Sequence, residues 1–357
     1  MKYYISVARA LFLSLLVTLS IGIHSSNDDI AIIRQRVLEL TLWPTPDEIT
    51  STVQNALTYS HTLNRSCYWP DINYYDTSIV AWSIATHMYR ITTMLQAITV
   101  NGSSIKNNAT IMAGVHCALL VWFTNDWQNG DWWYNQINIP LQATGQLLML
   151  DANATNVEIE QIKKISFRAA WWLHKPSYVG ANLVWMIQIQ LYRCLATVNL
   201  TGIEQGFSRM WQDVSISSSD EVGVQHDWSY HFHGPLLLSG AYGVIWANNI
   251  LLFLQCSHNT TYQPNDQILS VLANFLIKGD AWMIVTTFWD WHVLGRSISS
   301  PTNGFRVALE IDWMRTVAQL VTVNETKVAL FNLADRLDNK SSAPLLIGNK
   351  HFYASDY

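Results

Sequence analysis

The chain has 357 residues, of which 50% are hydrophobic and 13% are charged, and its formal net charge is −5. This composition suits a large core and excludes an intrinsically disordered chain. It also excludes a chain-wide basic field for polyanions, so we expect no nucleic-acid partner, and an acidic ligand would be held by a few local donors. The 17 tryptophans are unusual; indole rings either fill a core or stack on the apolar faces of sugars.

The first 25 residues are typical of a secretory signal peptide. Lys2 and Arg9 precede an apolar run from Ala10 to Ile23, and small residues follow that run. The run is shorter than a membrane-spanning helix needs, and no later stretch is long and apolar enough to span a bilayer. We therefore expect a secreted, extracellular protein with no membrane association once the signal is removed; a membrane anchor is the alternative.

Sequons and cysteines fit the same export route. Eight N-x-S/T sequons predict N-glycans on the protein surface. They lie at Asn64, Asn101, Asn108, Asn153, Asn199, Asn259, Asn324 and Asn339. The four cysteines could form up to two disulfides or remain buried thiols, and their wide spacing does not resemble a zinc site. They are Cys67, Cys117, Cys194 and Cys256.

Helical periodicity dominates the chain after the signal. The expected helices span residues 47–58, 78–100, 108–123, 139–150, 157–173, 181–198, 235–255, 266–277 and 304–322. Turn residues separate them, and strand-like alternation is scarce. This pattern predicts an all-α fold, an incomplete (α/α) toroid of antiparallel helix pairs.

Three polar and aromatic segments between these helices are candidate binding loops, at 127–134, 217–234 and 287–302. The middle segment holds an H-x-H pair, His231 and His233. With His226 and Asp227 nearby, a metal site there is an alternative. We expect neither a metal nor a cofactor.

Residues 226–243, H-D-W-S-Y-H-F-H-G-P-L-L-L-S-G-A-Y-G, resemble the catalytic stretch of polysaccharide lyase family 8. That family contains the chondroitin AC, hyaluronate and xanthan lyases. It places a catalytic His nine residues before a catalytic Tyr that is followed by Gly, as in His233 and Tyr242-Gly243 here. The H-G-P sequence resembles the chondroitin AC branch in particular.

Further segments resemble family motifs in the family's order. Asp131-Trp132-Trp133, with Ile137 and Pro140, resembles the N-W-W-x-x-E-I-x-x-P cleft motif. Gly180-Ala181-Asn182 resembles T-G-A-N, and residues 295–299 resemble G-R-x-I-S-R. The resemblance implies a toroid lyase domain over residues 26–345, and it implies that 346–357 begin a central β-sandwich domain that is otherwise missing.

The resemblance implies cleavage of uronic-acid-containing glycosaminoglycans, such as chondroitin or hyaluronan, by β-elimination. It gives catalytic roles to Asn182, His233, Tyr242 and Arg296. It gives substrate-binding roles to Trp127, Asp131, Trp132, Trp133, Gln136 and Ser300.

The chemistry explains why these residue types are needed. The C5 proton of a uronate is hard to remove until a donor such as the Asn182 amide neutralises the neighbouring carboxylate. Tyr242 could then act as base and acid in turn, assisted by Arg296 and His233. Alternatively, His233 is the base and Tyr242 the acid; the residues leave this choice open.

The chain departs from the family pattern at several positions. Asp131 replaces an Asn, Gln136 replaces a Glu, Val179 replaces a Thr, and Ser300 replaces a second Arg. The loss of that Arg favours a second hypothesis, a catalytically weak or inactive carbohydrate-binding toroid. A third hypothesis, a glycoside hydrolase, needs two carboxylates across a cleft, and no motif pairs the loop aspartates.

Each site residue also has a purely structural interpretation. Asn182 could cap the helix that follows it. Arg296 could pair only with Asp290. Tyr242 could be a core tyrosine, since it begins an apolar helical run, and Trp132 and Trp133 could also lie in the core.

Overall fold

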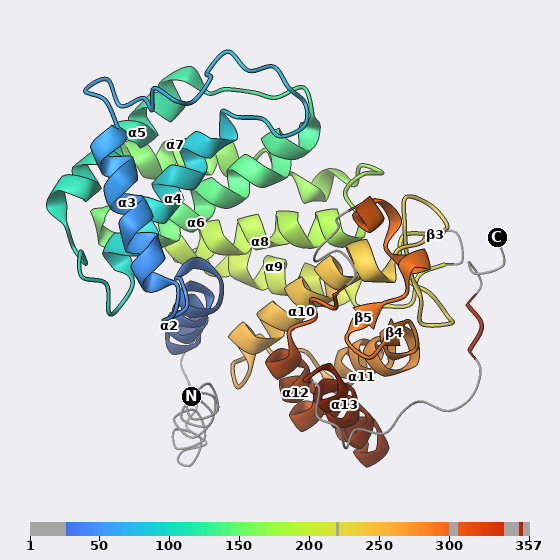
Figure 1. The fold of residues 1–357 in the computed structure, drawn as a ribbon. Helices are drawn as coiled ribbons and strands as arrows, with labels where there is room; N and C mark the ends of the chain where they lie inside the picture. Colours follow the sequence, from blue (N-terminus) through green and yellow to red (C-terminus); the bar gives the residue numbers. More distant parts are fainter. Residues whose placement is uncertain (1–25, 219–220, 300–305, 339–349, 353–357) are drawn as a thin grey trace.

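The computed structural model describes residues 26–218, 221–299, 306–338 and 350–352 (Figure 1). The predicted signal peptide, Ser300 and most of the segment 346–357 lie outside these described residues. Among the described residues, no helix has both the length and the apolar character needed to cross a membrane.

Most of the described chain is helical, which confirms the predicted all-α fold class. The α-helices are α2 (Ser26–Val37), α3 (Ile49–Thr62), α4 (Ala85–Thr99), α5 (Ala109–Asn125), α6 (Ile139–Leu150), α7 (Asn156–Ser166), α8 (Gly180–Ala196), α9 (Leu200–Asp213), α10 (Val244–Ser257), α11 (Asp266–Asn274), α12 (Ile311–Leu320) and α13 (Asn324–Leu337). Consecutive helices pack as pairs, among them α3 on α4, α8 on α9 and α12 on α13.

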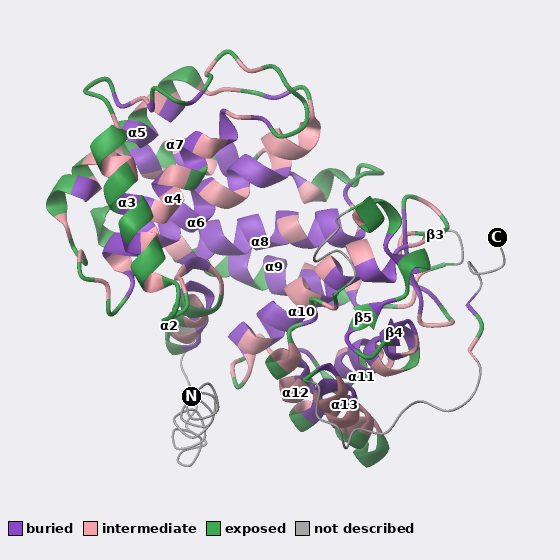
Figure 2. Cartoon of the chain, in the orientation of Figure 1, coloured by how far each residue is buried: buried purple, intermediate pink, exposed green. Residues whose placement is uncertain are grey.

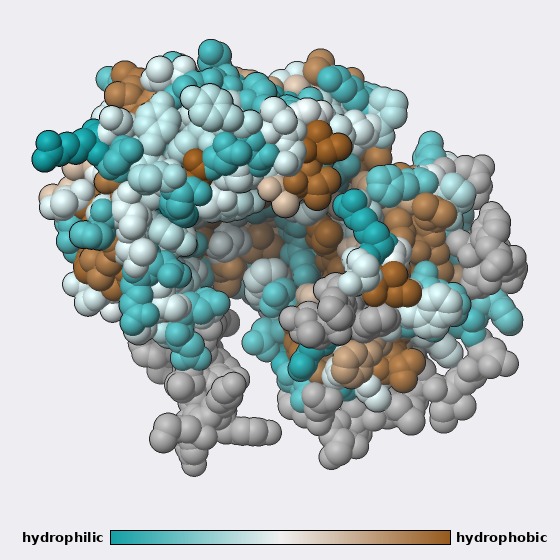
Figure 3. Space-filling model, turned by 45° about the horizontal axis from the view of Figure 1, so that its top comes forward, coloured by the Kyte–Doolittle hydropathy of each residue, from teal (hydrophilic) through white to brown (hydrophobic). Residues whose placement is uncertain are grey.

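The helices form two groups, joined where α10 packs on α8 and α2. Helices α3 to α9 lie together, and α10 to α13 lie beside the short strands (Figure 1). Helix α8 packs on α6 and α9 in the first group and on α10 in the second, so nearly all of its residues are buried (Figure 2). Figure 3 shows the surface hollowed between the two groups, with hydrophobic residues inside the hollow.

Among the described residues, two small antiparallel sheets interrupt the helical pattern. Strands β1 (Gly223–Val224), β2 (Tyr230–Phe232) and β3 (Leu236–Leu237) form the first sheet in that order, with Phe232 opposite Leu236. Strands β4 (Ile284–Val285) and β5 (Phe288–Trp289) form the second. Strands β1, β2 and β5 lie in segments that the sequence predicted as polar and aromatic loops, whereas β3 falls in a segment predicted as helix.

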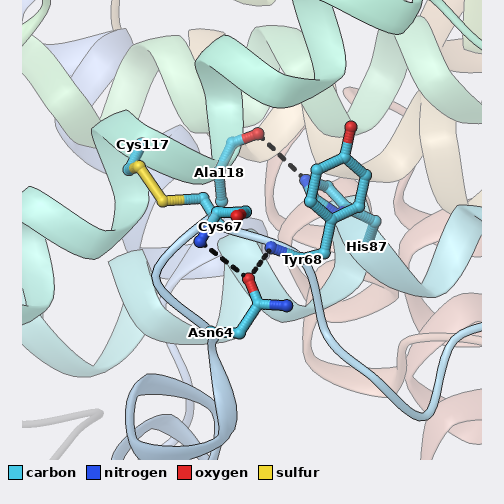
Figure 4. Close-up of a disulfide and its surroundings, with 7 residues drawn as sticks. Asn64, Cys67, Tyr68, His87, Cys117 and Ala118 are labelled. Carbon is cyan, nitrogen blue, oxygen red and sulfur yellow. Dashed lines mark hydrogen bonds between the residues drawn. A yellow bond between two sulfur atoms is a disulfide. The ribbon is translucent and has the colours of Figure 1, made fainter.

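One disulfide is present, and it joins Cys67 in the loop after α3 to Cys117 of α5 (Figure 4). Beside it, the Asn64 side-chain oxygen accepts hydrogen bonds from the backbone of Ser66 and Tyr68. The other two cysteines, Cys194 and Cys256, are buried thiols. The sequence had left bridges and thiols open, and the fold contains both.

Three predicted helices are shorter than expected, among them the helix predicted at 304–322, which is observed over Ile311–Leu320. The helix predicted at 78–100 begins only at Ala85, because Asp76 accepts backbone N–H groups from Ser78 and Ser83 and holds the preceding loop in turns. The helix predicted at 157–173 ends at Ser166, and a short 3₁₀ turn, Trp171–Leu173, follows it.

The segment 235–255 was wrongly predicted as one helix. Its first part forms β3 and then a π-helical turn, Ser239–Gly243, before α10 begins. The Leu238 N–H donates to the Tyr230 carbonyl, so hairpin pairing takes a backbone group that a helix would have used.

Helices α2, α9 and α13 were not predicted. In α9 the signal was weakened by Gly202 and Gly206, since glycine lowers helix propensity. The structure shows why glycine is needed there: a Cβ on Gly206 would lie 2.6 Å from Leu191 Cδ2 of α8. Close packing of two helices therefore outweighs local propensity.

Candidate active site

The phenol of Tyr242 is the meeting point of three segments. Its oxygen lies 3.3 Å from Nε2 of His233, the residue that directly follows β2. The same oxygen accepts a hydrogen bond of 3.2 Å from Arg296 Nη2. Arg296 belongs to a 3₁₀ turn, Gly295–Ser299. His233 and Arg296 are exposed and Tyr242 is half-buried, so this group can meet a ligand from solvent.

Tight packing places the Tyr242 turn. A Cβ on Gly240 would lie 3.0 Å from Trp289 Cγ and from Val293 Cγ2, and a Cβ on Gly243 would lie 3.0 Å from Tyr230 Cβ. The G-A-Y-G sequence is thus a packing requirement, because glycine lets the turn approach β2 on one side and the segment before Arg296 on the other.

The backbone at His233 is left-handed, with φ of +56°. Apart from glycine, this conformation favours asparagine, aspartate and histidine, and most other residues avoid it. It turns the His233 ring toward Tyr242, where the two rings meet edge to face at 5.1 Å and 90°.

Asn182 is the third residue of α8 and is 8% exposed. The N-cap position belongs to Val179, so the helix-cap interpretation of Asn182 is wrong. Its Nδ2 donates to the Ser177 carbonyl at 3.1 Å, which fixes the amide orientation. Within the described residues, no recorded hydrogen bond joins Asn182 to His233, Tyr242 or Arg296.

Aromatic residues from the segment before α6 and from around the start of α8 form ring contacts with one another. Trp132 lies 6.1 Å from Tyr178 and Trp133 lies 5.8 Å from Trp185, and we call these four residues the aromatic cluster. Tyr178 also donates a hydrogen bond to Gln136. The cluster rings are partly buried except Tyr178, which is buried, so core packing and ligand contact are compatible.

Trp127 is placed elsewhere. Its ring lies 5.0 Å from Tyr74 and 5.4 Å from Trp122, in the aromatic packing around His87. No ring contact recorded for the described residues joins Trp127 to the aromatic cluster. Packing therefore accounts for this tryptophan without a ligand.

A glycosidase would need two carboxylates across the cleft, but the three loop aspartates are each used by their own turn. Asp131, Asp227 and Asp290 accept the backbone N–H groups of Trp133, Ser229 and His292, respectively. Asp290 also pairs with the His292 ring at 2.8 Å, whereas Arg296 contacts Tyr242. The interpretation that Arg296 pairs only with Asp290 is thus wrong.

The histidine segment offers no metal cage in the part of the chain that the structure describes, where no three His, Cys, Asp or Glu side chains are placed to hold an ion. His231 is buried in β2, while the left-handed backbone sends His233 to Tyr242.

Sequence reasoning did not single out Phe232, Tyr178 or Trp185. Phe232 is stacked on Tyr242, and the other two rings belong to the aromatic cluster. A usable signal existed for Phe232, because Tyr230 and Phe232 alternate with polar neighbours as in a strand.

Comparison with known proteins decides the family. The model of the polysaccharide lyase family 8 N-terminal alpha-helical domain matches residues 43–331. The chain belongs to polysaccharide lyase family 8. The family resemblance inferred from the motifs is therefore confirmed.

Individual relatives agree with this assignment. The chain is 24% identical to chondroitinase-AC of Pedobacter heparinus over 242 residues, which are 68% of this chain and 34% of that protein. A chondroitinase AC lyase solved with oligosaccharides matches with a TM-score of 0.75 and 21% identity, over 88% of this chain and 45% of that one. The Streptomyces coelicolor chondroitin AC lyase solved with chondroitin sulphate matches with a TM-score of 0.69 and 16% identity, over 91% and 50%. The chain thus spans about a third of the length of the curated relative, and the structural likeness at these identities concerns the fold.

Proposed function

We propose that this family 8 chain is a lyase that cleaves uronic-acid-containing glycosaminoglycans, of the chondroitin or hyaluronan kind, by β-elimination. The observation that carries the proposal is the Tyr242 oxygen, which lies within hydrogen-bond distance of both an imidazole and a guanidinium. The relatives named as chondroitin AC lyases support an acidic polysaccharide substrate.

The reaction begins at the uronate carboxylate. Loss of the C5 proton puts negative charge on this group, so donors must stabilise it as the charge develops. Asn182 can donate from the first turn of α8, where unpaired N–H groups and the helix dipole also favour an anion. Its amide is held by Ser177, so little reorganisation is needed.

Proton transfer follows on the side of the sugar that faces Tyr242. One group takes the C5 proton, and an acid protonates the C4 oxygen as the C4–O bond breaks. Tyr242 can do both in turn, with the Arg296 cation stabilising the phenolate oxygen at 3.2 Å. His233 as the base and Tyr242 as the acid is the other assignment that the contact of 3.3 Å supports.

The aromatic cluster supplies binding energy away from the reacting atoms. Its indole rings can stack on sugar faces, while Gln136, which accepts a hydrogen bond from Tyr178, orders that part of the cleft. Asp131 caps its own turn through the Trp133 N–H, so its role is to shape the loop.

We also propose that the protein is secreted and N-glycosylated. A disulfide in a folded domain is typical of oxidising compartments. The sequon residues Asn64, Asn101 and Asn199 are exposed, as attachment of a glycan requires.

The test is to incubate the purified protein with chondroitin sulfate, hyaluronan or alginate and follow the ultraviolet absorbance of unsaturated uronate ends. Tyr242→Phe should lower the rate at least about 100-fold, because it removes the acid–base oxygen. Tyr74→Phe is the matched control: it also removes a tyrosine oxygen bonded to a histidine, but in a buried pair, and it should keep the activity.

The other outcomes separate the alternatives. New reducing ends without this absorbance would indicate a hydrolase. Binding without either product would support the carbohydrate-binding toroid, which the Ser300 departure favours. Neither binding nor product would refute both the lyase and the binding function.

A further inference from the structure

Phe232 forms the wall behind the reactive tyrosine. Its ring stacks on that of Tyr242 with centroids 4.0 Å apart and planes within 10° of parallel. Phe232 is 3% exposed, so the surrounding core fixes the position of its ring. Tyr242 therefore has one face against a fixed apolar surface and only the other face available to a ligand.

The strand geometry makes this arrangement unusual. In a regular strand Phe232 and His233 would point to opposite sides. Here both meet the same ring, Phe232 on its face and His233 against it at 90°. The left-handed backbone at His233 ends the alternation and allows two consecutive residues to contact one phenol.

The same phenylalanine also contacts the turn that precedes Asn182. A Cβ on Gly180 would lie 3.2 Å from Phe232 Cε2 and 2.5 Å from the Tyr230 hydroxyl. Gly180 has φ of +51° and is followed after one residue by Asn182. One ring thus touches both the reactive phenol and the turn that carries the proposed carboxylate donor.

We propose that Phe232 is a positioning residue for the elimination, and this inference rests on the proposed function. The stack fixes the tilt of Tyr242, which sets where its oxygen lies over the sugar. It also fixes the ring plane, in which the phenol hydrogen and the proton-accepting lone pair of the oxygen lie. Contact with Gly180 keeps that oxygen in register with the Asn182 amide.

The kinetic test compares two substitutions at Phe232. Phe232→Leu keeps an apolar side chain but loses the flat face, and it should lower kcat about 10-fold or more, because small displacements of reacting groups are costly. KM should change less than about threefold, since Asn182 and the aromatic cluster remain. Phe232→Tyr keeps the flat face and should retain most of kcat.

A matched control is Phe253→Leu. Phe253 is fully buried in α10, where its ring meets that of Phe207, so the substitution loses the same atoms from the core. It should lower thermal stability without lowering kcat. An equal fall of kcat in both leucine variants, or a loss confined to KM, would overturn the proposal. Phe232→Met serves as the second variant if the leucine variant does not fold.

A spectroscopic measurement separates this inference from the proposed function. With tyrosine labelled at the ring carbons, the Tyr242 signals are those lost in Tyr242→Phe, and the Phe232 ring current displaces them. Phe232→Leu should move these signals, whereas Phe253→Leu should leave them in place. Displaced signals without any unsaturated product in the wild type would keep the positioning and refute the lyase. Signals that do not move in Phe232→Leu would refute the positioning whatever the activity.

Discussion

Two tyrosine–histidine pairs lie within hydrogen-bond distance in the described part of the chain, and their surroundings differ. Tyr74 bonds to His87 Nδ1 at 2.9 Å, and Tyr242 lies 3.3 Å from His233 Nε2. Tyr74 and Tyr242 are both half-buried, but His87 is 0% exposed, whereas His233 is exposed. We call them the buried pair and the exposed pair after their histidines. The side-chain types are the same, so any difference in behaviour comes from what else touches them.

The buried pair is locked. His87 Nε2 lies 2.9 Å from the Ala118 carbonyl and must donate to it, so Nδ1 accepts from Tyr74 (Figure 4 shows the Ala118 contact). Burial lowers the pKa of His87 to about 4 and raises the pKa of Tyr74 to about 12. Near neutral pH this pair neither gains nor loses a proton.

In the exposed pair the third partner is a cation that contacts the tyrosine, whereas in the buried pair it is a carbonyl that contacts the histidine. Arg296 donates to the Tyr242 oxygen and can stabilise negative charge on it during a reaction. A tyrosine–histidine contact thus becomes structural or chemical according to solvent access and its third partner. The spacing of residues along the chain does not decide this.

Removal of the disulfide near the buried pair should have the largest effect on the stability of the fold. Cys117 precedes Ala118, whose carbonyl holds His87, and the bridge spans a sequence separation of 50 residues. Cys67→Ser/Cys117→Ser should lower the free energy of unfolding by about 4 kcal/mol in urea titrations, because the unfolded chain regains loop entropy.

Reductant provides the control for this variant. It should weaken the wild type to a similar extent and leave the double variant unchanged. The rate of elimination at 25 °C should stay the same. A rate that falls with the bridge would contradict the separation of the two regions.

The second prediction concerns acid. The folded state keeps His87 neutral down to about pH 4, while the unfolded chain takes up its proton near pH 6.5. Stability should therefore fall as pH drops from 6.5 toward 4 and level off below, with a total loss of about 3 kcal/mol from this group. His87→Gln keeps a donor for Ala118 but does not titrate. The urea-derived stability of the wild type, minus that of this variant, should show the fall; a flat difference would refute it.

The smallest expected effect concerns the exposed pair and the cation beside it. Arg296→Gln removes the cation from Tyr242 and should lower kcat on the order of 100-fold, about 2.7 kcal/mol, with a smaller change in KM. Arg90→Gln is the matched control, since Arg90 lies over Tyr59 and pairs with Asp71 in the buried pair's region. Equal rate losses in both variants would remove the distinction.

Sequence reasoning was most successful where the pattern reflects long-range geometry. The helical fold and the family follow from periodicity and from motifs in order, and His233 and Tyr242 do meet. Their spacing along the chain suits a hairpin and a tight turn that return to the same place. The role of each residue stays a prediction, which the variants above test.

Local conformation was harder to predict. The left-handed backbone at His233 and the stack of Phe232 depend on packing that no short pattern encodes. For Trp127 the difficulty is different. The sequence around a tryptophan beside a cleft motif is the same whether its ring faces a sugar or packs in the core, as the Trp127 ring does against Tyr74. Helix α9 was missed for a similar reason: Gly206 weakens its helical pattern, and the residue that requires this glycine, Leu191, lies on α8.

The left-handed backbone at His233 also has a consequence for evolution of the chain. For most L-residues this conformation costs about 1 kcal/mol or more, whereas histidine, like asparagine and aspartate, is enriched in it. Glycine would remove the remaining cost, but it would also remove the imidazole. Selection for stability alone would therefore favour glycine at this position, and a homologue that keeps histidine retains a side chain that folding does not require.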